Sequence, residues 1–178
     1  MELKFYPALS QVGAEAALRK MLELCDREFV PPLSCRTSTT QGGFAAADGA
    51  GVDAYLQAML AQPGILALEE GRVAAFLSYR ENYSCDHISA DTFPNCYIST
   101  VIVHPDFRGR GILRVFYETI LQKFSHCGIY TRTWSANAAQ AHILARLGFA
   151  ELSRIPDHRG PGIDTVYYAH LPQNEKRD

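Results

Sequence analysis

The stretch VHPDFRGRGILRVFYE, residues 103–118, decides the fold of this chain. One apolar run ends at Pro105, and another, at helical spacing, begins at Ile112. The turn between them gathers three arginines and two glycines: Arg108, Arg110, Arg114, Gly109 and Gly111. A chain with a formal net charge of only −2 has no general reason to concentrate cations at one turn. The stretch therefore predicts a strand, an anion-binding turn and a helix.

The predicted turn has the properties of a phosphate site. The first N–H groups of a helix have no acceptor within the helix, and the helix dipole favours negative charge there. Gly109 and Gly111 carry no side chain, so a phosphate can approach the backbone, while Arg108 and Arg110 add positive charge. The turn lacks the P-loop pattern, and Arg114 breaks the GxGxxG pattern of dinucleotide-binding folds. An exposed basic turn and an RNA-contacting patch stay open as alternatives.

The composition is that of an ordinary globular domain. With 178 residues, of which 47% are hydrophobic and 20% charged, the chain is long enough to bury a core as a single domain over 1–178. A pI near 6.3 argues against a nucleic-acid partner. No apolar run approaches the roughly 18 residues of a membrane span, so we expect no membrane partner. The N-terminus MELKFYPALS lacks the features of a secretory signal.

The cysteines indicate the compartment. Five scattered cysteines without a CxxC pair suit reduced thiols and therefore a cytoplasmic protein. Cys85 and His87 are the types of residue that bind metals, but they have no second pair nearby. Because a zinc site needs about four ligands, we expect no metal.

Apolar periodicity predicts eleven elements in the order β-α-α-β-β-β-α-β-α-β-β. Strands are expected at 2–7, 65–70, 72–81, 96–103, 128–134, 149–155 and 164–171, and helices at 12–27, 52–62, 109–126 and 138–148. This order predicts an α/β (α+β) fold, in which a mixed central sheet of about seven strands is flanked by about four helices.

Two segments carry a resemblance to a known family. The segment VIVHPDFRGRGI, 101–112, resembles the acetyl-CoA-binding segment of the GCN5-related N-acetyltransferases (GNAT), an apolar strand with V-x-P followed by R-G-x-G opening a helix. NAAQAHILARLGF, 137–149, is similar to the family's Asn-led helix that ends in L-G-F. Together the matches cover about 97–155. The resemblance implies a GNAT-like fold and an acetyl-CoA-dependent N-acyltransferase.

The resemblance also implies where acetyl-CoA lies. Backbone groups on the strand pair with its pantetheine arm, backbone amides of the turn wrap its pyrophosphate, and Asn137 contacts it from the end of the next strand. The implied cofactor residues are Val101, Ile102, Val103, Arg108, Gly109, Arg110, Gly111, Ile112, Leu113, Arg114 and Asn137. A plain helix N-cap is the alternative for Asn137, and a place in the core is the alternative for the strand residues.

Two positions depart from the family pattern. Leu113 stands where the turn usually carries a small residue. Leu144 stands where many members carry a tyrosine thought to protonate the departing CoA thiolate, and leucine cannot donate a proton. His142 is close in sequence but lies about 200° around the helix from residue 144, so we expect it to face elsewhere.

A base must take the proton from the attacking amine, and the sequence offers several candidates for it. Family members often place Glu or His on the strand, at the positions that Tyr97 and Ser99 occupy here. These two share one strand face. Neither is a strong base, so we expect them to order a water chain that carries the proton to solvent; packing is the alternative. Further unranked candidates are the carboxylates Glu81, Asp86 and Asp91.

The resulting expectation is transfer of an acetyl group to a primary amine, on a small molecule or a peptide, by direct attack on the thioester. A strand amide near Val101 is expected to stabilise the developing oxyanion. Helices 12–27 and 52–62, with the loop between them that contains EFVPPLS (28–34), are expected to form the acceptor pocket. The alternative is a catalytically inactive acyl-CoA-binding sensor or interaction module, which the missing tyrosine favours. A homodimer stays open.

Overall fold

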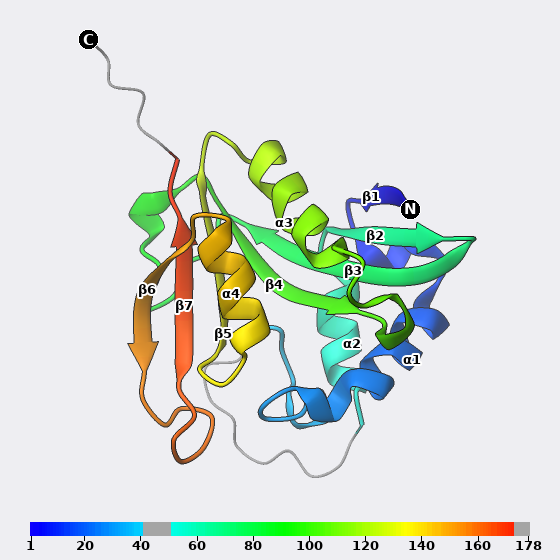
Figure 1. Ribbon diagram of the computed structural model, residues 1–178, viewed down its shortest axis with the longest axis horizontal. Helices are drawn as coiled ribbons and strands as arrows, with labels where there is room; N and C mark the ends of the chain where they lie inside the picture. Colours follow the sequence, from blue (N-terminus) through cyan, green and yellow to red (C-terminus); the bar gives the residue numbers. More distant parts are fainter. Residues whose placement is uncertain (41–50, 173–178) are drawn as a thin grey trace.

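The computed structural model describes residues 1–40 and 51–172 and contains one seven-stranded sheet in the order β1-β2-β3-β4-β5-β7-β6 (Figure 1). The strands are β1 (Glu2–Tyr6), β2 (Gly64–Glu69), β3 (Arg72–Glu81), β4 (Asn95–Val103), β5 (Gly128–Trp134), β6 (Ala150–Ile155) and β7 (Thr165–His170). The helices are α1 (Glu15–Cys25), α2 (Asp53–Leu60), α3 (Ile112–Lys123) and α4 (Ala138–Arg146). The predicted element order and the mixed sheet with its flanking helices are confirmed.

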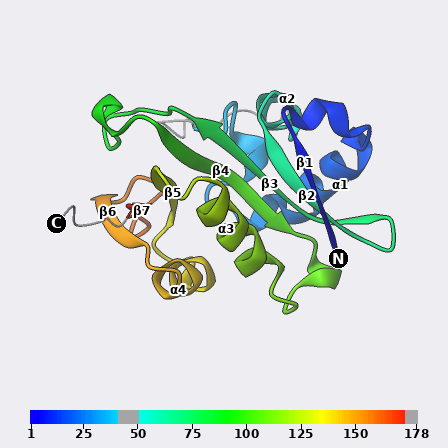
Figure 2. The same cartoon turned by 90° about the horizontal axis from the view of Figure 1, so that it is seen from above.

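The helices cover the two faces of the sheet in pairs. Figure 2 shows α1 and α2 on one face and α3 and α4 on the other. Strand β4 supplies both cores: Ile98 packs with α3 and α4, and Ile102 packs with α1 and α2. Strict alternation would put these two residues on one face, and the extra residue at Ser99 places them on opposite faces. Since both faces are covered, the central strands β3 and β4 are buried along most of their length.

The predicted start of the third helix at residue 109 is wrong. Gly109 and Gly111 have φ angles of +73° and +77°, and α3 begins only at Ile112. Left-handed backbone ends a right-handed helix, and glycine adopts it without steric cost. The first predicted helix likewise starts later, at Glu15, because Gly13 has a φ of +69°.

Strands β4 and β5 part halfway along their length. Their parallel pairing runs only from Asn95 to Ile98 on β4 and from Gly128 to Thr131 on β5. On the other side of β4, Ser78 of β3 pairs with Thr100 while Tyr79 pairs with Ile98, so Ser99 is an extra, bulged residue. A bulge bends its strand and increases the local twist. The C-terminal half of β4 therefore leaves β5 and keeps an open edge.

Three further observations concern partners and ligands. All five cysteines are free. Within 1–40 and 51–172 there is no group of three or more His, Cys, Asp and Glu side chains that could hold a metal. In the same residues, every helix is too short or too polar to cross a lipid bilayer. Residues 41–50 of the loop expected to border the acceptor pocket lie outside the described residues.

Candidate functional site

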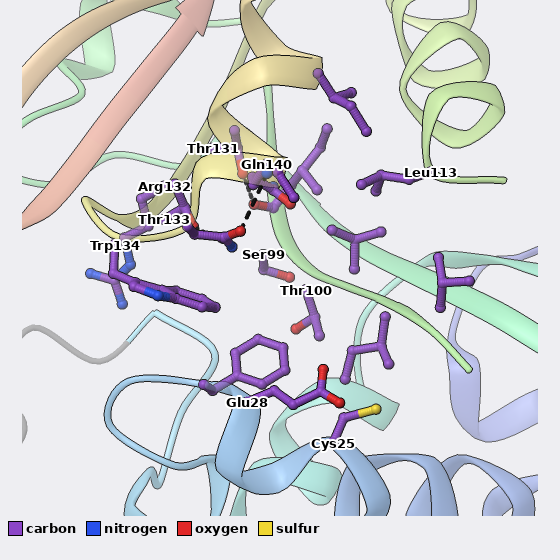
Figure 3. A pocket seen from close by; sticks show the side chains of 18 of the residues that line it. Cys25, Glu28, Ser99, Thr100, Leu113, Thr131, Arg132, Thr133, Trp134 and Gln140 are labelled. Atoms are coloured by element: carbon purple, nitrogen blue, oxygen red, sulfur yellow. Dashed lines mark hydrogen bonds between the residues drawn. The ribbon is translucent and has the colours of Figure 1, made fainter. Parts of the chain in front are cut away.

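A cavity of about 510 Å³ opens where β4 and β5 part. Its walls come from Ile98–Val103 on β4, the turn before α3, the end of β5, the first turn of α4, and the segment around η2 (Asp26–Glu28). In Figure 3, Ser99 and Thr100 lie near the centre, Leu113 lies on one side, and Arg132 and Trp134 lie on the opposite side. The cavity thus joins the predicted anion site to the bulge on β4.

The turn before α3 presents free backbone donors to this cavity. Gly111 is the N-cap of α3 and provides no side-chain cap, so the first N–H groups of the helix have no acceptor within it. Among the described residues, no backbone oxygen accepts a hydrogen bond from the N–H groups from Gly109 to Arg114. A Cβ atom at either glycine would meet no atom within 4 Å, so space for a ligand lies against the backbone.

The three arginines of the turn are already ion-paired. The shortest nitrogen–oxygen distances are 2.8 Å from Arg108 to Glu28, 2.9 Å from Arg110 to Glu69 and 2.7 Å from Arg114 to Glu118. These pairs are partly exposed, and such pairs are worth about 0–1 kcal/mol, so an incoming phosphate can displace them. Arg108 and Arg114 line the cavity.

Arg110 is not among the residues that line the cavity. Its guanidinium lies 5.1 Å from the centroid of the Phe107 ring and donates a hydrogen bond to the backbone oxygen of Asp106. These contacts, together with Glu69, turn its charge away from the cavity. The expectation that Arg110 faces the anion site is not met in this structure, because neighbouring acceptors hold its side chain elsewhere.

The open edge of β4 offers the backbone groups of Val101 and Val103. The N–H of His104 donates to the oxygen of Ala74 on β3 at 2.9 Å, so the backbone groups of His104 point toward β3. Because backbone groups alternate in direction along a strand, those of Val101 and Val103 face the opposite, open edge. The oxygen of Val103 indeed accepts a hydrogen bond from Arg108 Nε at 3.1 Å. The side chains of both valines pack against the core beside α3, as the alternative proposed.

The structure brings Ser99 to the cavity but not Tyr97. The Ser99 hydroxyl donates to Gln62 Oε1 and lies 2.9 Å from Ser78 Oγ. Next to it, Thr100 Oγ1 lies 2.7 Å from the hydroxyl of Tyr55, whose pKa is raised by burial. The bulge is what turns Ser99 and Thr100 toward the same side and creates this row of hydroxyl groups.

Tyr97 belongs to a separate aromatic cluster, whose members do not line the cavity. It is 1% exposed and packs with Ile88, Tyr130 and Tyr167, and its ring centroid lies 4.4 Å from that of Tyr83. Burial raises the pKa of Tyr97 far above its ordinary value, so its hydroxyl stays protonated at neutral pH. The part of Tyr97 in the proton path stays a prediction.

Helix α4 contributes its N-terminal end to the cavity. Asn137 is its N-cap: Oδ1 accepts from the N–H of Gln140 at 3.2 Å, and Nδ2 donates to Thr133 Oγ1 at 3.0 Å. The N-cap alternative is therefore confirmed, and Asn137 also lines the cavity. Leu144 is fully buried in the core and does not line the cavity. A side chain at this position thus serves packing in this chain.

Several residues that line the cavity were not predicted from the sequence. Glu28 lines the cavity. The three carboxylates that the sequence offered as candidate bases do not line it: Glu81, Asp86 and Asp91. Other unpredicted lining residues are Arg36, Arg132, Trp134 and Arg159. Arg36 and Arg159 are 123 positions apart along the chain, so no local motif joins these residues. The segment 28–34, expected to border the acceptor pocket, contributes Glu28 and Phe29 to the cavity, which are one charged and one apolar side chain.

Known proteins share both the sequence pattern and the fold of this chain. A family model described as Acetyltransferase (GNAT) family matches residues 36–149. A search of curated protein sequences finds no match. Both predicted segments, the turn at 108–111 and the helix that ends in Leu147-Gly148-Phe149, fall within the matched residues.

Solved structures share the whole fold. Ribosomal-protein-alanine N-acetyltransferase from Brucella melitensis is 15% identical, with 96% of this chain and 99% of that chain covered and a TM-score of 0.65. The yncA protein of Salmonella typhimurium, solved with its cofactor acetyl-CoA, is 17% identical over 100% and 98% of the two chains, with a TM-score of 0.63. Smu.2055 from Streptococcus mutans is 14% identical over 97% and 100%, with a TM-score of 0.68. At these identities the likeness shows the fold.

Proposed function

The chain belongs to the acetyltransferase (GNAT) family, and from this premise we propose that it transfers the acetyl group of acetyl-CoA to a primary amine in the cavity between β4 and β5. The observation that carries the proposal is the meeting of two sets of free backbone groups in one cavity. One set is the N–H groups that start α3, and the other is the open edge of β4. Acetyl-CoA has an extended pantetheine arm that ends in phosphates, so it can form hydrogen bonds with both sets of groups.

The residues present fit acetyl-CoA. Val101 and Val103 offer backbone donors and acceptors to the amide groups of the pantetheine arm, like an added strand. The N–H groups from Gly109 to Arg114 offer donors to the pyrophosphate, where the α3 dipole also favours negative charge. Leu113 does not block this site, because its side chain lies on the cavity wall beside the turn (Figure 3).

The chemistry requires a deprotonated amine and a stabilised carbonyl oxygen. The amine nitrogen forms a bond to the acetyl carbon as the carbon–sulfur bond breaks; of the two protons that the ammonium loses, one ends on the CoA thiol and one in solvent. We assign the open-edge N–H of Val101 as the donor that stabilises the oxygen as charge develops on it. The hydroxyl groups of Ser99 and Thr100 can hold the water that takes the proton outward.

The serine at the bulge gives the first test of these roles. We expect Ser99→Ala to lower kcat roughly threefold or more and to leave acetyl-CoA affinity nearly unchanged, which is a small effect beside the about 10²–10⁴-fold of direct acid–base catalysis. Tyr97→Phe is expected to lower kcat less, because Tyr97 lies outside the cavity. Steady-state kinetics and calorimetry measure both, with the exposed Ser10→Ala as control. A wild-type kcat for Ser99→Ala would remove the serine from the proton path.

The arginines of the turn give a second test. We expect acetyl-CoA affinity to fall as ionic strength rises from about 0.01 to 0.2 M, because exposed charges are screened over this range. Arg108→Gln should flatten this dependence, since Arg108 lines the cavity. Arg110→Gln is the matched control, because Arg110 pairs with Glu69 outside it. Equal salt slopes for wild type and Arg108→Gln would show that Arg108 does not act on the bound phosphates.

Turnover separates the proposed enzyme from an inactive acyl-CoA-binding module. The buried Leu144 at the tyrosine position is the observation that favours the module. Release of CoA thiol is measured with saturating acetyl-CoA and a panel of primary amines, and the acetylated product is identified by mass spectrometry. Amine-dependent release supports the transferase. Tight acetyl-CoA binding without release for any amine supports the module.

A further inference from the structure

A buried glutamine contacts Ser99 from outside the cavity. Gln62 lies between α2 and β2, is 4% exposed and does not line the cavity. Its Nε2 donates to Thr39 Oγ1 at 2.7 Å and to the backbone oxygen of Ala58 at 2.8 Å. Its Oε1 accepts a hydrogen bond from the Ser99 hydroxyl at 2.5 Å. Both polar atoms of this buried amide are therefore paired, and one of them is paired with a residue of the cavity wall.

The partners of Gln62 fix the direction in which its amide points. A backbone oxygen can only accept a hydrogen bond, so the group that faces the Ala58 oxygen must be the NH2 group. A reversed amide would place its own oxygen there and lose the bond in a buried place, where unpaired polar groups are costly. Oε1 therefore faces Ser99, and because an amide oxygen has no proton to give, it accepts the proton of the Ser99 hydroxyl.

The Ser99 hydroxyl has one proton and two lone pairs. The backbone oxygen of Ser78, at 3.1 Å, also lies within reach of this proton, but Gln62 Oε1 is closer at 2.5 Å. With its proton directed to Gln62, Ser99 Oγ accepts from the Ser78 hydroxyl, which is fully buried and lies 2.9 Å away. One lone pair of Ser99 remains, and Ser99 lies near the centre of the cavity (Figure 3). Toward a bound molecule, Ser99 is thus a hydrogen-bond acceptor.

The direction of this hydrogen bond matters for proton transfer. A water molecule that contacts an acceptor must donate one of its own O–H groups to it, which keeps the lone pairs of the water free. A free lone pair is what a water needs to take a proton from the acceptor amine. If Ser99 donated instead, it would occupy a lone pair of the same water and make that water a weaker base.

We propose that Gln62 is a positioning residue for the acetyl transfer: it holds Ser99 as a hydrogen-bond acceptor, so that the water at Ser99 donates to it and receives the proton of the amine. This inference rests on the proposed transferase function and adds a residue to its proton path. The ammonium loses one proton to the water, and the water passes this proton to solvent. Ser99 and Gln62 keep their own protons throughout.

Replacing Gln62 by methionine tests the proposal. Gln62→Met keeps the length of the side chain and removes the acceptor, so it should lower kcat roughly threefold or more, as Ser99→Ala does, and leave the affinity for acetyl-CoA unchanged. Gln57→Met, at an exposed glutamine of α2, is the matched control. A wild-type kcat for a folded Gln62→Met protein would overturn the proposal.

Two further variants separate positioning from a loss of packing. Two independent threefold losses would multiply to about ninefold, whereas a shared path predicts that Gln62→Met combined with Ser99→Ala loses only about threefold. Gln62→Glu keeps an oxygen that accepts the Ser99 proton and removes the NH2 group, so it should retain more of kcat than Gln62→Met. Independent losses in the double variant, or equal losses in Gln62→Glu and Gln62→Met, would contradict the positioning role.

The wild-type protein gives a test that depends on no variant of Gln62. The two Nε2 protons of Gln62 are expected to exchange with solvent at least about tenfold more slowly than those of the exposed Gln57, as measured by NMR, because both are bonded in a buried place. Equal exchange rates would overturn the fixed amide. Failure of the proposed function is recognised separately, because the wild-type protein then acetylates no amine. With an active wild type, a failure of this inference is recognised from the Gln62 measurements alone.

Discussion

Replacing Gly111 by valine is expected to weaken acetyl-CoA binding at least tenfold, about 1.4 kcal/mol. Gly111 has a φ of +77° and is the N-cap of α3, directly beside the N–H groups proposed to bind the pyrophosphate. A Cβ there projects into space that no protein atom occupies within 4 Å, which is the space that a phosphate needs. A β-branched residue also strains left-handed backbone. Calorimetric titration with acetyl-CoA measures the loss.

A second glycine separates the loss of the ligand site from the strain. Gly13 has a φ of +69° and a ψ of 13°, close to the +77° and 7° of Gly111, and a Cβ atom added to it would also meet no atom within 4 Å. It precedes α1 and does not line the cavity. Gly13→Val should therefore lower the free energy of unfolding about as much as Gly111→Val does, without changing the affinity for acetyl-CoA. Unchanged affinity in a folded Gly111→Val variant would remove the turn from the cofactor site.

Truncation of Leu144 is expected to have the largest effect on stability. Leu144→Ala should lower the free energy of unfolding by about 2–5 kcal/mol, because it leaves a cavity in a close-packed core. Leu144 is fully buried and packs in the cluster that joins α3 and α4 to the sheet. Leu144→Met keeps the volume and should lower it by less than about 1.5 kcal/mol. Urea unfolding followed by circular dichroism measures both changes.

The same pair of variants tests whether Leu144 has any catalytic part. Leu144→Met should leave kcat close to that of the wild type, because the side chain does not line the cavity. A large fall in kcat for a stable Leu144→Met protein would contradict a purely structural role. Ordinary thiols ionise with a pKa near 8.5, so the departing thiolate can be protonated late, by water or by the ammonium. Catalysis can therefore proceed without a tyrosine at this position.

The sequence by itself determined the order of the elements and the place of the anion site. The β2–β3 hairpin, β4 and the helix that ends before Gly148 all follow from local apolar spacing and from turn residues. The anion-binding turn before α3 could also be predicted from the sequence, because its glycines and arginines lie within four consecutive positions, 108–111. Such features depend on backbone conformation over a few residues, which neighbouring side chains largely control.

Only the tertiary structure decided which side chains meet in the cavity. The bulge at Ser99 depends on the register of β4 against β3, which alternation in one strand cannot reveal. The sequence predicts Arg110 as a phosphate ligand, yet an ion pair with Glu69, 41 positions away, keeps its side chain outside the cavity. Arg36 and Arg159 share the Val30 oxygen only after the chain has folded. Contacts of this kind join distant segments through packing and charge, and no local pattern encodes them.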